Sequence, residues 1–286
     1  MPHFATEDSL VHVAIRAEEL VQIGPFVFTN SMVGILIATA ILLAAAIYVS
    51  RNHAVVPGRM QSIIEMPVDF MGGIVRAQGG ERWRSIVPLI LTLFLLVLIA
   101  NWVGLLPGVG TIGVNWTGSD GETVVHPIIR PASADLNFTL ALALIAFFAF
   151  ITWGIRANGV RGYLKETFVA TPAYMTPIMT PIHIVSELSR LISLSMRLFG
   201  NVFAGEVLLA VMLALTFAVV PAIFLGLEMV FGFVQALVFA LLTMTYITLA
   251  MAGHGSHDDA HDEHGEPADE GHAHAPGGAL DAQSQT

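Results

Sequence analysis

The sequence predicts an all-α polytopic membrane protein, and three properties of the chain support this prediction. Of its 286 residues, 55% are hydrophobic and only 12% are charged, about half the charged share of a soluble domain. The mean hydropathy is +0.73. Several apolar runs reach the roughly 20 residues that a bilayer-spanning helix needs. This composition excludes a disordered chain, a soluble enzyme domain and a basic nucleic-acid-binding protein.

The N-terminal 25 residues are expected to form an external segment. They contain four acidic residues against one arginine, without the basic start and apolar run of a cleavable signal peptide. Residues 11–21 have the pattern of a short amphipathic helix at the membrane surface.

A membrane domain is predicted over residues 26–252. Its first three spans are expected at 26–49, about 86–106 and about 136–155. Between the first two, residues 60–75 space their apolar side chains like an interfacial amphipathic helix rather than a span. Residues 108–135 contain Gly, Asp and Pro and are expected to form a polar loop.

The last two apolar segments, 182–220 and 222–252, are longer than upright spans. Three Thr-Pro pairs precede them and predict a new helix start at Pro181. As helices the segments would be ~58 Å and ~46 Å long, against a hydrocarbon core of ~30 Å. They therefore predict a hairpin of two long, strongly tilted helices that turns at Pro221, giving about five membrane-embedded helices in all.

Residues 253–286 form a different kind of segment. They hold six histidines, eight acidic residues and no Lys or Arg, so this tail is expected to be disordered. A role in buffering metal ions or sensing pH is the alternative. Without the tail, the net charge of -10 falls close to zero.

The distribution of basic residues predicts how the chain is oriented in the membrane. Eight of them lie in the two stretches 51–84 and 156–165, whereas only Arg16 and Arg130 lie on the opposite side. By the positive-inside rule, the N-terminus is external and the C-terminal tail is cytoplasmic.

Charged and polar side chains interrupt the long apolar segments. An arginine at mid-membrane costs ~2.5–3.5 kcal/mol on insertion scales, so such residues normally face protein or water and mark ion paths. An arginine cannot release its proton, so Arg197 is a fixed positive charge, whereas carboxyl groups can exchange protons. Two structural alternatives remain: Arg190 forming a simple ion pair with Glu187, and Arg197 pairing with an acid on a neighbouring helix.

Helical geometry sorts these side chains by face. At 100° per residue, Asn201 shares a face with Arg197, whereas Glu206 points to the opposite side. Glu228 and Gln235 share a face of the last helix. A hairpin symmetric about Pro221 would place Glu206 opposite Gln235, so Arg197 meets Gln235 only if the crossing is offset.

Three motifs in order closely resemble those of the a subunit of F-type ATP synthases. Residues 193–206 read SLSMRLFGNVFAGE, residues 101–107 read NWVGLLP, and residues 131–139 read PASADLNFT. Gln235, Thr245 and Tyr246 in the last helix also fit this family. The resemblance covers about residues 26–251.

The resemblance implies a non-catalytic, proton-translocating subunit of the membrane sector, CF(0), in the inner membrane of a bacterium. Its partners would be a ring of c subunits, the b subunits of the peripheral stalk, other subunits of the synthase and membrane lipid. Two aqueous half-channels would end at different places on the ring, so that proton flow becomes rotation and drives ATP synthesis. No cofactor, metal or nucleic acid is implied.

Carried over by position, the resemblance assigns proton translocation to a small set of residues. Arg197 matches the arginine that faces the ring, Glu206 and Glu228 the polar pair of the external half-channel, and Gln235 the polar partner of the arginine. One of the pair is a histidine in many members, whereas both are acidic here. Asn201 either steadies Arg197 or packs between helices. Candidate half-channel-lining residues are Asn101, Asp135, His183, Glu187, Arg190 and Ser193.

Two other classes of membrane protein are alternatives to an ATP synthase subunit. A secondary transporter could use Arg197 to bind an anionic substrate, but the sequence shows neither internal repeats nor broken helices in both halves. A membrane-embedded enzyme would need a metal-spaced cluster, and His183 is the only histidine within the last two long apolar segments.

Overall fold

The computed structural model describes residues 19–23, 26–52, 58–106, 109, 113–117, 123–127, 130–168, 176–216 and 219–252. Within these ranges five helices are long and apolar enough to cross a membrane. The prediction of an all-α polytopic membrane protein is therefore confirmed. The tail 253–286 and residues 11–18 of the expected N-terminal helix lie outside the described residues.

The chain enters the first long helix through a β-hairpin that the sequence did not predict. Strand β1 (Glu19–Ile23) pairs antiparallel with β2 (Phe26–Thr29). Residues 19–21, which the sequence predicts as helix, are therefore part of a strand. Helix α1 (Asn30–Asn52) starts four residues after the predicted span. The hydroxyl groups of Thr29 and Ser31 form a hydrogen bond of 2.9 Å at the start of α1. Threonine and serine are common at helix N-termini.

Two helices and a polar loop follow. Helix α2 (Arg59–Gln78) corresponds to the expected amphipathic helix. The short η2 (Gly80–Arg82) leads into α3 (Trp83–Gly104), the second predicted span. The loop holds a second unpredicted hairpin of β3 (Gly113–Thr117) and β4 (Thr123–Pro127), then η3 (Ala132–Ala134).

Helix α4 (Leu136–Phe168) is longer than the predicted third span and breaks at Gly159, whose φ of 73° suits glycine. Helix α5 (Thr176–Leu215) begins before Pro181, so the predicted start at Pro181 is wrong. Pro177 occupies the first turn instead, where a proline loses no hydrogen bond. Helix α6 (Val219–Ala252) follows a turn that precedes Pro221.

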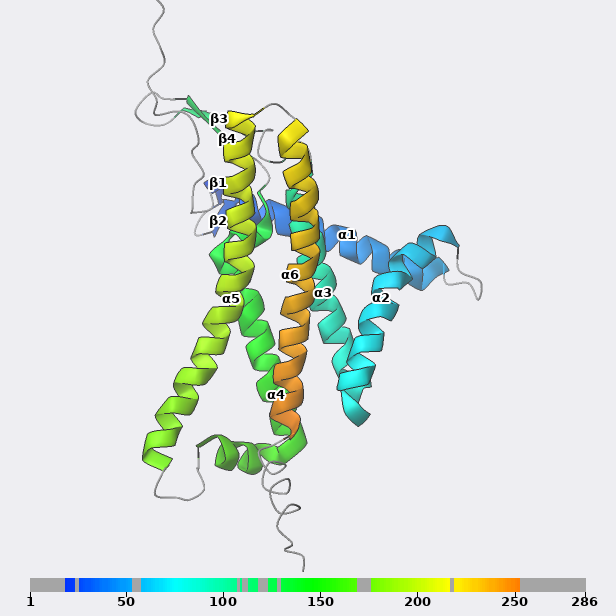
Figure 1. Ribbon diagram of the computed structural model, residues 1–286, viewed down its shortest axis with the longest axis vertical. Helices are drawn as coiled ribbons and strands as arrows, with labels where there is room; N and C mark the ends of the chain where they lie inside the picture. Colours follow the sequence, from blue (N-terminus) through cyan, green and yellow to red (C-terminus); the bar gives the residue numbers. More distant parts are fainter. Residues whose placement is uncertain are drawn as a thin grey trace, which may run out of the picture.

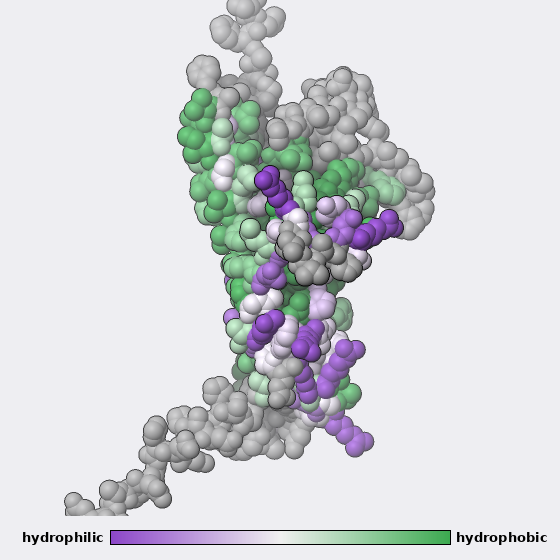
Figure 2. Space-filling view, turned by 90° about the vertical axis from the view of Figure 1, so that its right-hand side faces the viewer, coloured by the Kyte–Doolittle hydropathy of each residue, from purple (hydrophilic) through white to green (hydrophobic). Residues whose placement is uncertain are grey.

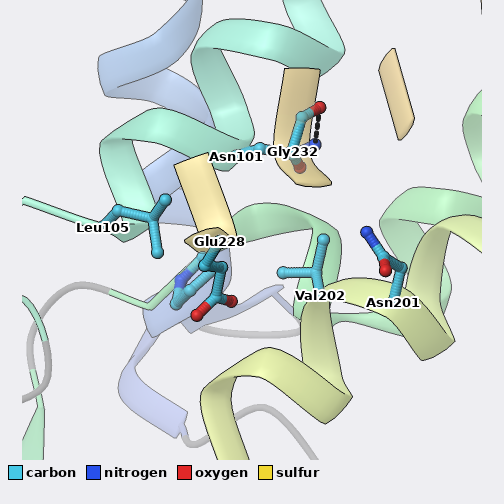
Figure 3. A pocket seen from close by; sticks show the side chains of 7 residues that line it. Asn101, Leu105, Asn201, Val202, Glu228 and Gly232 are labelled. Carbon is cyan, nitrogen blue, oxygen red and sulfur yellow. Dashed lines mark hydrogen bonds between the residues drawn. The ribbon is translucent and has the colours of Figure 1, made fainter. Parts of the chain in front are cut away.

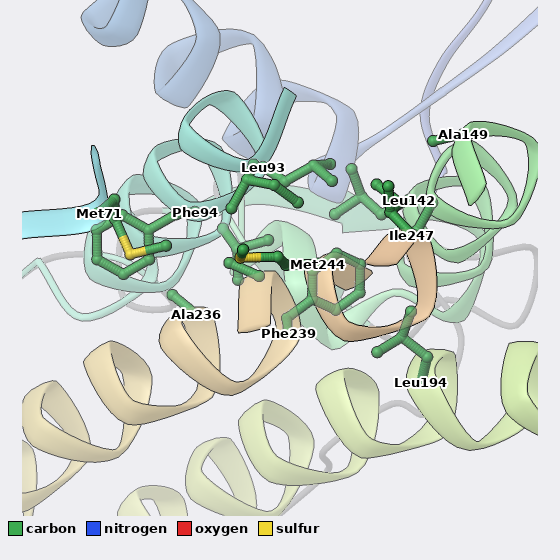
Figure 4. Packing of buried hydrophobic residues seen from close by; sticks show 14 of the residues in the cluster. Met71, Leu93, Phe94, Leu142, Ala149, Leu194, Ala236, Phe239, Met244 and Ile247 are labelled. Carbon is green, nitrogen blue, oxygen red and sulfur yellow. The ribbon is translucent and has the colours of Figure 1, made fainter. Parts of the chain in front are cut away.

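The apolar core lies between α3, α4, α5 and α6. Phe94 of α3, Leu142 of α4, Leu198 of α5 and Phe239 of α6 are all almost fully buried in it. Figure 4 shows this packing, with Met71 of α2 reaching the edge of the cluster. Close packing of this kind fixes the register of the helices that carry the polar residues.

The long helices do not share one direction. Figure 1 shows α5 and α6 along the long axis of the molecule and α1 running across it. The 23 residues of α1 give ~35 Å, enough for an upright span, whereas the 40 residues of α5 give ~60 Å. An upright α1 therefore requires α5 and α6 to be strongly tilted.

Hydrophilic residues gather on one side of the molecule. Figure 2 looks at the side on which α2 lies in Figure 1 and shows hydrophilic side chains concentrated there. The exposed arginines of the two basic stretches are Arg51, Arg59, Arg76, Arg82, Arg84, Arg156 and Arg161.

Candidate functional site

The register of the α5–α6 hairpin places the central polar residues. A methyl group added to Gly205 would overlap the carboxylate of Glu228, so these two residues face each other. Eight residues further from the turn on each helix lie Arg197 and Ala236, which follows Gln235. Because the turn lies between Leu215 and Val219 rather than at Pro221, Arg197 reaches the level of Gln235.

Glu228 opens onto a small cavity between α3, α5 and α6. Figure 3 shows Asn101, Leu105, Asn201, Val202 and Gly232 around it. The centre of a water molecule has about 20 Å³ available there, enough for one water. The cavity therefore brings together three sequence-predicted site residues, Asn101, Asn201 and Glu228.

Asn101 is fixed at the edge of this cavity. It is 4% exposed, and its Nδ2 donates to the carbonyl of Gly232 at 3.2 Å. Gly232 allows the approach, because a Cβ there would lie 3.3 Å from that of Asn101. The Oδ1 atom of Asn101 is buried without a hydrogen-bond partner among the described residues, so it can accept from a water in the cavity.

Glu206 pairs with an arginine that the sequence analysis did not select. Arg130, only 4% exposed, donates from Nε at 3.3 Å and from a terminal nitrogen at 3.0 Å to the same Glu206 oxygen. The sequence predicts only that Arg130 lies in the polar loop 108–135, and its position next to the motif at 131–139 was the available signal. The two carboxylates, Glu206 and Glu228, are still close enough for their charges to interact.

Arg197 faces outward from the chain. It is exposed on α5, beside the exposed apolar side chains of Ile192 and Met196. In the part of the chain that the structure describes, it makes no ion pair or hydrogen bond. The structural alternative of a pair with an acid on a neighbouring helix is therefore not observed. Gln235 is buried, and its Nε2 has no partner among the described residues.

A second polar cluster lies on the far half of α5. Arg190 donates to Glu187 at 2.8 Å, which confirms the predicted ion pair, and its guanidinium stacks over Tyr246 of α6 at 5.2 Å. His183 lies half-buried one turn before Glu187, and Ser193 is exposed. We call Glu187, Arg190 and Tyr246 the far cluster, and Arg130, Glu206, Glu228 and Asn101 the turn-side cluster.

Asp135 lies apart from both clusters. Its Oδ1 accepts from the backbone N–H of Asn137 at 2.9 Å, the geometry of a helix N-cap. Its Oδ2 accepts from the Ser31 hydroxyl at 2.6 Å. These contacts join the start of α4 to the start of α1.

The sequence was compared with known families and proteins. The family described as ATP synthase A chain matches residues 32–248. An ATP synthase subunit a from Mycobacterium marinum is 35% identical over 80% of this chain and 89% of its own length. Another from Moorella thermoacetica is 30% identical over 84% of this chain and 99% of its own length. The ordered motifs, the five long apolar helices and these matches show that the chain belongs to the ATP synthase A chain family.

Proposed function

We propose that the chain is the stator subunit of the proton-conducting membrane sector of an F-type ATP synthase. The observation that supports this most is the position of Arg197 on α5, between the far cluster and the turn-side cluster. Buried apolar residues of α5 and α6 separate the clusters, namely Leu194, Leu198, Ala236, Phe239 and Met244.

The buried polar side chains on this stretch of α5 and α6, Ser195, Gln235 and Thr243, include no carboxyl or imidazole group, so we propose that no proton passes directly between the clusters inside the chain. A fixed cation that cannot release its proton adds an electrostatic barrier between them. A proton must therefore leave this chain at one cluster and return at the other. A rotating ring of c subunits with carboxyl groups would provide that carrier, with Arg197 keeping each passing carboxyl group unprotonated.

Each cluster then serves as one half-channel. The turn-side cluster, with Asn201 at its cavity, admits protons from outside, and the far cluster, with His183 and Ser193 nearby, releases them to the cytoplasm. We assign Gln235 on α6, at the level of Arg197, as the polar residue that would act beside it once the ring is bound. The subunit itself forms no catalytic site, and each proton crossing 100 mV supplies ~2.3 kcal/mol to rotation.

Purification tests this assignment. Extraction in a mild detergent should yield the chain together with a ring of small subunits, peripheral-stalk b subunits and the catalytic subunits, identified by mass spectrometry of the intact complex. A chain that transports ions when isolated by itself would contradict the assignment.

We also propose that the hydrophilic side seen in Figure 2 is cytoplasmic, because α2, which lies on that side in Figure 1, carries the exposed Arg59 and Arg76. The chain has no cysteine, so single cysteines report accessibility without background. A membrane-impermeant maleimide should label Ala77→Cys on α2 only in inverted vesicles, and Leu106→Cys at the end of α3 only in right-side-out vesicles. The reverse pattern would contradict this orientation.

A further inference from the structure

We infer that Arg130 is a positioning residue that holds Glu206 as a permanent carboxylate, leaving Glu228 as the proton carrier of the turn-side cluster. The inference rests on the proposed function and divides the two glutamates into different roles. It follows from how Arg130 is held, what it contacts, and what surrounds Glu228.

The backbone of Arg130 is held in place by packing against α1. A Cβ on Gly34 of α1 would overlap the Arg130 carbonyl oxygen, so α1 packs directly on this peptide. The residues that follow, Ala132 to Ala134, are almost completely buried. The polar loop is therefore anchored at the point where the Arg130 side chain enters the protein interior.

The contact to Glu206 favours the charged form of both groups. Two N–H donors of the guanidinium converge on one carboxylate oxygen, and a guanidinium keeps its proton under all physiological conditions. Charge-assisted hydrogen bonds of this kind weaken when the carboxylate is protonated, because the ionic contribution is lost. Because Arg130 is 4% exposed, an unpaired guanidinium there would be an uncompensated buried charge.

Glu228 has different surroundings. Among the described residues no ion pair to Glu228 is found, and its carboxylate lies at the cavity that has room for one water. Gly205 leaves space for this carboxylate. The fixed charge of Glu206 acts on Glu228 and compensates part of the positive charge of an arriving proton. Because the cavity can hold a water beside its carboxylate, Glu228 has the water access that a proton carrier needs.

Charge-neutral replacements separate these roles. Inverted membrane vesicles that contain the whole synthase are compared for ATP-driven proton uptake, followed by the quenching of a weak-base dye and normalised to the amount of assembled complex. The variants are Arg130→Gln, Glu206→Gln, Arg130→Gln with Glu206→Gln, Glu228→Gln, and Arg130→Gln with Glu228→Gln. Arg130→Lys tests the charge alone, and Arg161→Gln, at an exposed site, is the control for loss of a positive charge.

Each of Arg130→Gln and Glu206→Gln should slow proton uptake at least about tenfold, because each leaves one member of the pair uncompensated. This is the effect of a tenfold change in proton affinity. Removing both charges should restore uptake to within about threefold of the wild type, since no buried charge is then unpaired. Arg130→Lys should keep most of the rate. Glu228→Gln should stop uptake, and Arg130→Gln should not restore it.

The inference is overturned if the Arg130→Gln, Glu206→Gln double variant is no faster than the slower single variant, or if Glu206→Gln alone matches the wild type. It is also overturned if Glu228→Gln conducts normally. Wild-type vesicles that contain the complex but take up no protons would instead overturn the proposed function itself.

Discussion

At the scale of single residues, four charged side chains in a low-charge protein have four different environments. Arg197 is exposed on an outward face, Arg130 is buried, Glu206 is paired and Glu228 borders a cavity. Chemical type therefore does not decide their roles; position does. The two arginines illustrate this, because the same guanidinium is held by a partner at one site and left available at the other.

Gly205 gives a direct test of the space around Glu228. Gly205→Ala should displace the Glu228 carboxylate, because the added methyl group would overlap it. Forcing that side chain from its rotamer costs ~1 kcal/mol, or about fivefold in rate. We expect proton uptake per assembled complex to fall by about that factor.

Gly226→Ala is the matched control, since, apart from the adjoining helix backbone, no described atom lies within 4 Å of the position where its Cβ would be. It should leave proton uptake unchanged and slightly favour the helix. Equal rates in the two variants would show that Glu228 does not need the space at Gly205.

Part of this residue-scale description could be predicted from the sequence. Arg197, Glu206 and Glu228 stand out because a charge in an apolar run is costly. Arg130 does not stand out, because it lies in a polar loop where an arginine is unremarkable. Its burial arises only when α1 packs against residues 130–134, which is a tertiary event that no local pattern encodes.

At the scale of elements, segment length and turn position determine which residues meet. The sequence correctly predicts two long helices in a hairpin, but it puts the turn at Pro221 and a helix start at Pro181. Pro221 lies in the first turn of α6, where a proline is tolerated. Pro181 lies in the second turn of α5 and removes one backbone hydrogen bond without ending the helix. The short hairpins β1–β2 and β3–β4 were missed because the apolar and polar runs around them show no extended strand alternation.

Asp135 belongs to this scale, because its contacts organise the start of α4. Asp135→Ala removes the N-cap and the acceptor for Ser31, which should cost ~1 kcal/mol. We expect thermal unfolding of the complex to occur a few degrees lower, about 2–4 °C, with proton uptake per assembled complex retained.

Asp135→Asn separates capping from proton transfer. An asparagine keeps an acceptor for both contacts and is an effective N-cap, but it cannot exchange a proton as a carboxyl group does. Stability and proton uptake should both stay near wild-type values. A loss of proton uptake in a stable Asp135→Asn complex would make Asp135 a half-channel residue instead.

At the scale of the whole molecule, the apolar core separates two polar clusters while α1 crosses the direction of α5 and α6. On its outward face α5 exposes apolar side chains such as Ile192 and Met196 beside Arg197. The sequence predicts the tilt of α5 and α6 from length alone. It does not predict that a core of buried apolar side chains lies between the clusters, because this depends on which faces of four helices meet in the core.

The most direct test of the central claim is ATP synthesis driven by an imposed proton gradient in vesicles carrying Arg197→Ala. Assembly is checked by the subunit content of the purified complex, and Arg161→Ala serves as the control for a lost exposed arginine. We predict a complete complex that makes no ATP, because the clusters would lose the fixed cation that couples proton passage to the ring. Synthesis near the wild-type rate in the assembled Arg197→Ala complex would contradict the account.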